Sequence, residues 1–217
     1  MQQPEKQYTY ANIHCLLVDL DDTLYPYHTG VWGMAANRID QFLVEEIGVQ
    51  PAEVKSMRER LFTQYGTTLR GLLIENKVDM DHYLDYVHDI PIDDLLAPDP
   101  ELDQMFHTLP QRKVIFTNAS TDHAKRVLRR LGIQHHFERI IDIYDIFPFC
   151  KPQIEAYHTT LDIIKEQSEH CLMIDDNARN LATARSLGIS TVIVGPQPHD
   201  GNAHINEIKE LGRLLTP

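Results

Sequence analysis

Residues 16–24 read Leu-Leu-Val-Asp-Leu-Asp-Asp-Thr-Leu, an apolar run that ends in closely spaced carboxylates. A strand that is apolar on both faces is typical of a parallel sheet covered by helices on each side. In such sheets, ligands bind beyond the carboxyl ends of the strands. Asp19 and Asp21 are two residues apart, so they lie on one side of an extended chain, where a single cation or phosphoryl group can meet both. Taken alone, the pattern also fits an acidic turn after a strand.

The composition is that of an ordinary soluble globular protein, with 42% hydrophobic and 24% charged residues in 217. No apolar run approaches the ~20 residues of a transmembrane helix, and residues 1–9 lack the apolar stretch of a secretory signal. We therefore expect a cytoplasmic protein that does not bind membranes. The formal net charge of −12 argues against a nucleic-acid polymer as partner. An anionic small substrate then needs a local cation, which favours a divalent metal.

The three cysteines are an odd number and show no Cys-x-x-Cys spacing, which argues against a disulfide framework and a zinc site. Cys15 and Cys171 lie in expected strands, where a cysteine serves as a small buried hydrophobe. No histidine stands beside Cys150 in the sequence, so a catalytic thiol is not favoured there.

After residue 95, expected strands alternate with expected helices. The strands are predicted at 113–116, 140–143, 171–174 and 191–194, and the helices at 121–131, 153–167 and 177–187. Repeated strand–helix–strand units imply a parallel sheet with right-handed crossovers. The predicted fold class is therefore α/β.

Residues 28–96 show helical periodicity in place of strands. Helical patterns are predicted at 36–47 with an end at Gly48, from Pro51 to Tyr65, at 69–74 and at 82–87. We expect an all-helical insertion over residues 28–96, carried by a core of residues 1–27 and 97–217.

Polar side chains stand at three further points where a parallel sheet would gather them. Thr117 and Asn118 follow an apolar strand, Lys151 precedes a proline at a helix start, and Asp175 and Asp176 close another apolar strand. Each has a structural explanation when taken alone, as a helix cap or a solvated lysine. Carboxylates gathered at one edge, however, repel by about 4 kcal/mol per close pair at an effective dielectric constant of 20. The combination therefore favours a phosphate site with Mg²⁺.

In this order, Asp19-x-Asp21-x-Thr23, Thr117-Asn118, Lys151-Pro152 and Asp175-Asp176 resemble the four motifs of the haloacid dehalogenase superfamily, over nearly the whole chain. The resemblance implies a Rossmann-like parallel sheet core with helices on both faces. The helical insertion is similar to the superfamily's C1 caps. Residues 19–26 and 65–71 more closely resemble the pyrimidine 5'-nucleotidase branch.

The resemblance implies phosphomonoester hydrolysis through an aspartyl-phosphate. Asp19 is then the nucleophile, and Asp21 protonates the leaving oxygen and afterwards activates water. Thr117, the Asn118 backbone and Lys151 are expected to neutralise the transferring phosphoryl oxygens. Dehalogenating relatives lack the second aspartate and Mg²⁺, so Asp21 favours phosphoryl transfer over cleavage of a carbon–halogen bond.

The resemblance also implies a ligand set for Mg²⁺. The Asp19 side chain, the Asp21 backbone carbonyl and Asp175 are the expected direct ligands. Asp176 is expected to act through water or as an orienting group.

Substrate choice is expected to lie in the insertion, because the core contacts only the phosphate. Arg70 is the candidate contact, in the segment 66–71, whose glycines allow the backbone to approach a ligand closely. A surface arginine on a helix is the alternative. Tyr25, Tyr27 and Trp32 follow the first motif, where one of them could stack on a base or sugar or pack the junction with the core.

Two further pairs of residues are assigned more ordinary roles. His82 and His88 are interpreted as surface histidines, since the chain contains 12 histidines. Gly30 and Gly33 could absorb a hinge movement that closes the insertion over the substrate.

The expected substrate is a small phosphorylated metabolite, namely a pyrimidine nucleoside 5'-monophosphate. One alternative is a phosphatase or phosphomutase that acts on a sugar phosphate or phosphoglycolate. Another is a regulator that binds phosphate without chemistry. The sequence leaves open whether the protein is a monomer or a homodimer.

Overall fold

A six-stranded parallel sheet forms the centre of the protein, in the order β3-β2-β1-β4-β5-β6. The computed structural model describes residues 12–75, 78–199 and 201–215. The polar segment 1–9, expected to carry no secretory signal, lies outside the described residues. The strands are β1 (Cys15–Val18), β2 (Arg112–Phe116), β3 (Arg139–Ile141), β4 (Cys171–Asp175), β5 (Ser190–Val194) and β6 (Ala203–Ile205).

The strand β1 lies in the middle of this sheet, between β2 and β4. All four of its residues are buried, as its unbroken apolar sequence predicts for a strand covered on both faces. Its register pairs Val18 with Ile115 on β2 and with Ile174 on β4. The carboxyl ends of the three strands therefore lie side by side, which confirms the predicted sheet edge.

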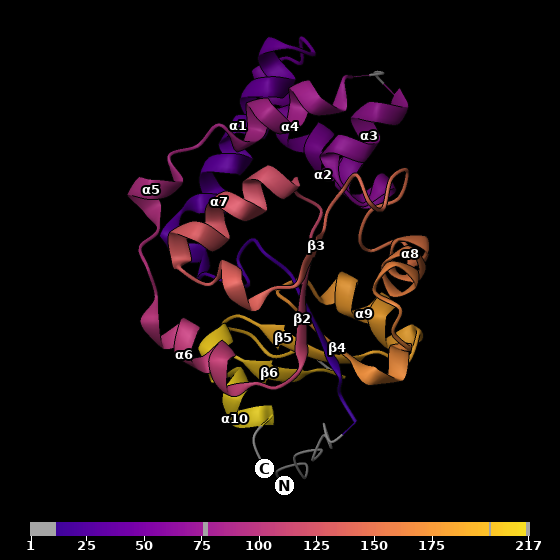
Figure 1. The fold of residues 1–217 in the computed structure, drawn as a ribbon. Helices are drawn as coiled ribbons and strands as arrows, with labels where there is room; N and C mark the ends of the chain where they lie inside the picture. Colours follow the sequence, from indigo (N-terminus) through magenta and orange to yellow (C-terminus); the bar gives the residue numbers. More distant parts are fainter. Residues whose placement is uncertain (1–11, 76–77, 200, 216–217) are drawn as a thin grey trace, which may run out of the picture.

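Helices cover both faces of the sheet, as predicted (Figure 1). On one side lie α6 (Pro100–Thr108) and α7 (Thr121–Leu131), with α10 (Leu211–Leu215) against α6. On the other lie α8 (Ile154–Ile164) and α9 (Ala178–Ser186). Helix α7 begins after a Ser120 cap and ends at Gly132 with a left-handed φ of 80°, the residue predicted to end it.

The chain from residue 31 to residue 95, between β1 and β2, contains helices and no strand among its described residues. Its helices are α1 (Val31–Glu45), α2 (Val54–Tyr65), α3 (Thr68–Glu75), α4 (Met80–His88) and α5 (Ile92–Leu95). Helix α1 packs on α4 and α2 packs on α3, and Figure 1 shows these four helices grouped above the sheet. Among the described residues, no helix is both long and apolar enough to cross a membrane. We refer to residues 28–96 as the insertion.

Several boundaries and elements differ from the sequence expectation. Strand β3 ends at Ile141 and not at residue 143, because the Asp142 carboxylate accepts hydrogen bonds from the backbone of Thr121, Tyr144 and Asp145 and so starts a turn. Helix α1 begins five residues earlier than predicted, directly after Gly30, whose φ of 84° marks the break. Strand β6 has three residues at the sheet edge and carries no clear apolar pattern.

The glycines of segment 66–71 allow close packing between protein segments, where a close approach to a ligand was expected. A Cβ atom at Gly71 would lie 2.6 Å from Cδ2 of Leu61 and 2.9 Å from Cδ2 of Tyr65. Gly66 has a φ of +95°, and a Cβ atom there would lie 3.0 Å from Sγ of Cys150. The two glycines thus seat α3 on α2, and α2 on the segment that carries Lys151.

We therefore predict that Gly71→Ala destabilises the protein. The added methyl overpacks the α2–α3 contact, which typically costs about 1–3 kcal/mol in the free energy of unfolding. Gly33→Ala on α1 is the matched control, because nothing lies within 4 Å of its Cβ position, and alanine stabilises a helix by about 0.5–1 kcal/mol relative to glycine. Denaturant unfolding measures both; equal midpoints for the Gly71 variant and the parent protein would contradict the packing role.

Candidate functional site

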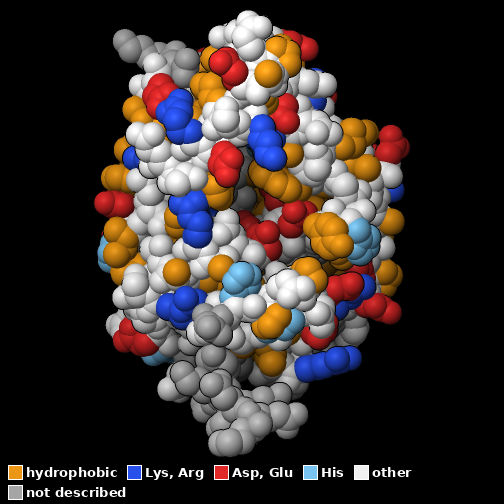
Figure 2. Space-filling view, turned by 180° about the vertical axis from the view of Figure 1, so that it is seen from behind, with side chains coloured by type: hydrophobic (Ala, Val, Ile, Leu, Met, Phe, Trp, Pro, Cys, Tyr) orange, Lys and Arg blue, Asp and Glu red, His pale blue; other side chains and the backbone are white. Residues whose placement is uncertain are grey.

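A cavity of about 650 Å³ lies between the insertion and the carboxyl ends of β1, β2 and β4. It opens on the face shown in Figure 2, where acidic side chains lie at the floor of a hollow. The core contributes the predicted site residues Asp19, Asp21, Thr117, Asn118, Lys151 and Asp176 to its wall. The structure therefore brings together side chains that are up to 157 positions apart in the sequence.

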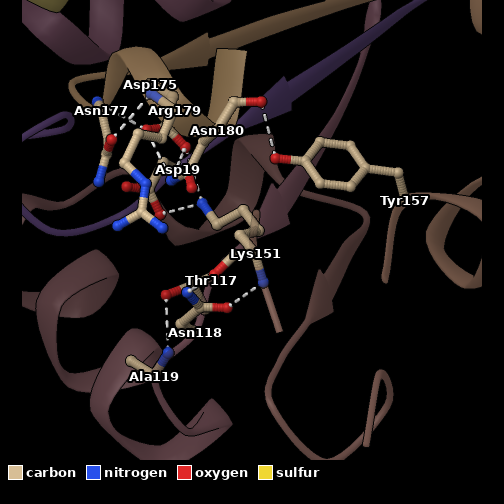
Figure 3. Close-up of polar contacts among 10 residues, drawn as sticks. All are labelled: Asp19, Thr117, Asn118, Ala119, Lys151, Tyr157, Asp175, Asn177, Arg179 and Asn180. Atoms are coloured by element: carbon tan, nitrogen blue, oxygen red, sulfur yellow. Dashed lines mark hydrogen bonds and ion pairs between the residues drawn. The ribbon is translucent and has the colours of Figure 1, made fainter. Parts of the chain in front are cut away.

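The ammonium of Lys151 lies between two carboxylates at the floor of this cavity (Figure 3). Its Nζ is 2.7 Å from Oδ1 of Asp19 and 2.8 Å from Oδ2 of Asp175, and its side chain is 1% exposed. Burial by itself lowers the pKa of a lysine, but the charges of Asp175 and Asp19 outweigh it and raise the pKa above the ordinary value. Lys151 is therefore a fixed positive charge at neutral pH.

Asn118 holds the backbone of Lys151 through two hydrogen bonds (Figure 3). Its Oδ1 accepts from the Lys151 N–H at 2.8 Å, and its Nδ2 donates to the Lys151 carbonyl at 3.0 Å. The neighbouring Thr117 is 2% exposed, and its Oγ1 accepts from the Ala119 N–H at 3.0 Å. The end of β2 is thus fixed to the loop that presents the lysine.

Asp175 and Asp176 are adjacent but differ in their surroundings. Both oxygens of Asp175 accept hydrogen bonds, Oδ1 from the Asn177 N–H and Asn180 Nδ2, and Oδ2 from Asn180 Nδ2 and Lys151. The carboxylate of Asp176 lines the cavity and forms no hydrogen bond or ion pair with any residue that the structure describes. The carboxylate of Asp176 is therefore freer than that of Asp175, which was the expected direct ligand of Mg²⁺.

The acidic groups of the cavity floor fit a divalent cation. Carboxylate oxygens of Asp19, Asp175 and Asp176 lie within 4.8 Å of one another. Desolvation, together with the charge of Asp175, raises the pKa of Asp19 to about 7 against the opposing pull of Lys151. Desolvation and the charges of Asp19 and Asp175 raise the pKa of Asp176 to about 8. Carboxylates that crowd in this way form a hard oxygen donor set, and such a set suits Mg²⁺.

Asp21 has two partners that the sequence analysis did not identify. The Tyr25 hydroxyl donates to its Oδ1, and Nε2 of His123 lies 2.9 Å from the same oxygen. Burial raises the pKa of Asp21, but the charge and hydrogen bond of His123 and the bond from Tyr25 outweigh it and lower the pKa to about 2. A signal for His123 was present, because it lies in the first turn of the helix that follows the Thr117-Asn118 strand end.

His88 lines the cavity, where a surface position was expected. Its ring stacks on that of His123, with centroids 4.2 Å apart and an interplanar angle of 12°. Burial, the charge of His123 and the charge of Arg126 lower the pKa of His88 to about 3 against the pull of Asp21. His82 does lie at the surface, where its Nε2 is 3.3 Å from Glu46.

The three aromatic residues after the first motif occupy different environments. Tyr25 is 2% exposed and bonded to Asp21, whereas Tyr27 is 67% exposed and lies outside the cavity. Trp32, in the first turn of α1, lines the cavity. Of the three, Trp32 is thus the one placed to contact a bound molecule.

Arg70 is not brought together with the other candidate residues. Its Nε donates to the Pro148 carbonyl at 3.0 Å and its Nη1 to the Tyr65 carbonyl at 3.3 Å. It does not belong to the cavity wall. The guanidinium instead links α3 to the loop that precedes Lys151.

The cysteines take no part in the cavity. All three are free and buried, and Cys15 and Cys171 lie in neighbouring strands as expected. Burial raises the pKa of the Cys150 thiol, whose Sγ lies 3.6 Å from the Tyr65 carbonyl. These environments match structural roles.

Comparison with known proteins shows a family match over most of the chain. A family model described as haloacid dehalogenase-like hydrolase matches residues 13–188. The chain is 28% identical to Phosphate metabolism protein 8 from Saccharomyces cerevisiae over 190 residues, which cover 81% of this chain and 59% of that protein. The chain therefore spans about three fifths of the length of this relative.

Solved structures share the fold at low sequence identity. A HAD phosphatase from Thermococcus onnurineus is 15% identical with a TM-score of 0.63, and the alignment covers 94% of this chain and 98% of that one. The HAD-hydrolase YfnB from Bacillus subtilis, solved with magnesium bound, is 19% identical with a TM-score of 0.62 and coverages of 94% and 99%. L-2-haloacid dehalogenase from Xanthobacter autotrophicus is 14% identical with a TM-score of 0.61 and coverages of 94% and 98%.

We predict that Mg²⁺ stabilises the protein more at pH 8 than at pH 5. The pKa values of Asp19 and Asp176, about 7 and 8, exceed the ordinary 3.8. The folded state therefore binds these protons more tightly than the unfolded chain and loses stability as pH rises from about 4 to 8. Mg²⁺ at about 100 times its Kd adds about 2.7 kcal/mol, or about 5–11 °C in Tm.

Thermal unfolding with Mg²⁺ or with chelator, at both pH values, measures this effect. Asp176→Asn should raise the Tm in chelator at pH 8 and remove most of the Mg²⁺ effect. Asp162→Asn, at an exposed position on α8, is the matched control and should behave like the parent. An unchanged Mg²⁺ effect in the Asp176 variant would show that the Asp176 carboxylate does not bind Mg²⁺.

Proposed function

Because the chain belongs to the haloacid dehalogenase-like hydrolase family, we propose that it is a Mg²⁺-dependent phosphomonoester hydrolase that acts through an aspartyl-phosphate. The observation that carries the proposal is the pair Asp19 and Asp21 at the cavity floor. Asp19 contacts a fixed ammonium, whereas the donors that contact Asp21 all meet its Oδ1, and no described residue forms a hydrogen bond with its Oδ2. Two carboxylates in such different environments can take different roles.

In the first half of the proposed reaction, an oxygen of Asp19 attacks phosphorus while the bond to the leaving-group oxygen breaks. Asp21 gives that oxygen its proton, so that an alcohol leaves and an aspartyl-phosphate remains. The resting pKa of Asp21 is about 2, but the negative charge of a bound phosphate raises the pKa of a neighbouring carboxyl. Substrate binding thus favours the protonated acid that this step needs.

In the second half, water attacks the phosphorus of the aspartyl-phosphate and gives a proton to Asp21. The bond between Asp19 and phosphorus breaks, inorganic phosphate forms, and both aspartates return to their initial states. The Thr117 hydroxyl, the Asn118 backbone N–H and the Lys151 ammonium contact the phosphoryl oxygens in this proposal. Fixed donors of this kind stabilise the charge that spreads over these oxygens in the transition state.

The Asp19 and Asp176 carboxylates and the Asp21 backbone carbonyl are the proposed ligands of Mg²⁺. When bound, Mg²⁺ supplies positive charge that lowers the pKa of Asp19 and polarises the phosphoryl group. Asp175 is proposed to orient Lys151, because both of its oxygens already accept hydrogen bonds from the protein. The charge repulsion among the acidic side chains supports a cation at this place.

The insertion side of the cavity supports a nucleoside 5'-monophosphate as substrate. Its wall combines the aromatic side chains of Trp32, Phe62 and Tyr83 with the ion pair between Arg58 and Asp40, whose Nη1 and Oδ1 are 2.7 Å apart. An aromatic surface beside paired donors and acceptors suits a base, which offers a flat face and a polar edge. We propose pyrimidine nucleotides, in line with the resemblance of residues 19–26 and 65–71 to pyrimidine 5'-nucleotidases.

We predict Mg²⁺-dependent phosphate release that is fastest with UMP or CMP. The measurement compares nucleoside monophosphates, sugar phosphates and phosphoglycolate, each with Mg²⁺ and with chelator. Asp19→Asn is the blank, because it removes the nucleophile while nearly preserving shape. A sugar phosphate as the best substrate would keep the chemistry and reject the nucleotide assignment. A lack of turnover with every substrate would favour a phosphate-binding regulator.

We predict that Trp32→Ala raises KM for UMP and leaves KM for phosphoglycolate nearly unchanged. Loss of stacking on one base costs about 1–3 kcal/mol, which corresponds to about 5- to 150-fold in KM for UMP. Tyr27→Ala is the matched control, since Tyr27 is an aromatic residue of the same segment outside the cavity. Equal effects of Trp32→Ala on both substrates would show that Trp32 does not contact the base.

A further inference from the structure

Asp21 is held by one of its two carboxylate oxygens. The hydroxyl of Tyr25 and Nε2 of His123 both meet Oδ1, the latter at 2.9 Å. Among the residues that the structure describes, none forms a hydrogen bond with Oδ2. Both partners are 2% exposed and lie on the buried side of the carboxylate. The two hydrogen bonds to Oδ1 oppose the exchange of the two oxygens by rotation about the Cβ–Cγ bond.

His123 contacts Asp21 through its Nε2. A carboxylate oxygen accepts, so Nε2 carries the proton in this contact. Its Nδ1 is buried and has no hydrogen-bond partner among the described residues. The ring is thus held by its Asp21 contact and by packing alone.

The packing on His123 comes from the insertion. His88, the last residue of α4, stacks on the His123 ring with centroids 4.2 Å apart. Its Nδ1 is 3.3 Å from the Ser120 hydroxyl, and Nη1 of Arg126 donates to its carbonyl at 2.7 Å. Ser120 is the N-cap of α7, and Arg126 lies in the middle of this helix. The end of α4 is therefore attached to the same helix that carries His123.

We propose that His123 positions the acid–base carboxyl of Asp21, so that proton transfer takes place at Oδ2. Because His88 packs on His123, this arrangement depends on the contact between the insertion and α7. This inference rests on the phosphatase activity proposed above. Two donors occupy Oδ1 and leave no place for a proton there. Oδ2 therefore gives its proton to the leaving-group oxygen as the bond to phosphorus breaks, and later takes one from the attacking water.

The test uses the dependence of the first chemical step on the leaving group. The three leaving groups differ in how much their departure depends on protonation. 4-Nitrophenolate leaves without a proton, phenolate depends on protonation to a larger extent, and the 5'-alkoxide of UMP depends on it most. A misplaced acid therefore slows UMP far more than 4-nitrophenyl phosphate. A variant that only weakens folding slows all three substrates by the same factor.

We predict that His123→Asn lowers kcat/KM by about 10- to 100-fold for UMP and by less than about 3-fold for 4-nitrophenyl phosphate. The loss for UMP is part of the ~10²- to 10⁴-fold that general acid–base catalysis contributes. The asparagine amide is too short to reach Oδ1. His123→Gln, whose amide nitrogen comes close to the Nε2 position, should restore most of the activity towards UMP. Tyr25→Phe removes the other donor to Oδ1. Like His123→Asn, it should lower kcat/KM more for UMP than for 4-nitrophenyl phosphate.

His88→Ala should show the same leaving-group dependence with a smaller effect, about 3- to 10-fold for UMP, because the Asp21 contact remains while its support is lost. His136→Asn is the matched control. His136 is also a largely buried histidine bonded to an aspartate, Asp103, at 2.8 Å, and it is not part of the cavity wall. This variant should leave the ratio between the substrates unchanged.

The outcomes separate this inference from the proposed function. A parent protein that releases phosphate from none of the three substrates rejects the proposed function itself. An active parent with equal losses for all substrates in His123→Asn and Tyr25→Phe rejects the positioning role. A failure of His123→Gln to exceed His123→Asn on UMP also overturns it.

Discussion

The buried ammonium of Lys151, between the carboxylates of Asp19 and Asp175, is the interaction on which the site depends. Burying each of these charges costs several kcal/mol in lost hydration, and removal of one partner leaves a charge uncompensated. The surroundings are therefore organised to hold the group together. Asn118 fixes the backbone of the lysine, and Asn180 and the Asn177 N–H saturate Asp175. Neighbouring strand ends become one rigid polar unit at the cavity floor.

This rigidity divides the acidic residues into two kinds. Both oxygens of Asp175 accept hydrogen bonds from the protein, whereas Asp176 faces the cavity without a hydrogen-bond partner among the described residues. A similar contrast separates Asp19, held by a cation, from Asp21, held by neutral or titratable donors. Identical side chains thus differ in proton affinity and availability because their neighbours differ.

Sequence reasoning located the features that local pattern determines. The apolar runs of β1, β2 and β4 predicted the parallel sheet, and because strand ends meet at one edge, they also predicted that Asp19, Thr117 and Asp175 lie together. The rotation of a helix about its axis is set by tertiary packing, so the sequence did not reveal that Arg70 faces the Pro148 loop or that His88 faces His123. Asp175 differs from Asp176 because Asn180 donates hydrogen bonds to both of its oxygens. Asn180 lies five residues after Asp175, and no sequence motif marks it.

The insertion leaves the pairing of β1 with β2 undisturbed, from Cys15 opposite Arg112 to Val18 opposite Ile115. For the register of the sheet, residues 28–96 therefore behave as a long loop, and doubling the length of a loop costs only about 0.6 kcal/mol in closure entropy. An evolving lineage can then replace or enlarge these helices at nearly constant core stability. The chemistry at the strand ends and the recognition of the rest of the substrate can then change separately, except where the insertion contacts α7 and the loop before Lys151.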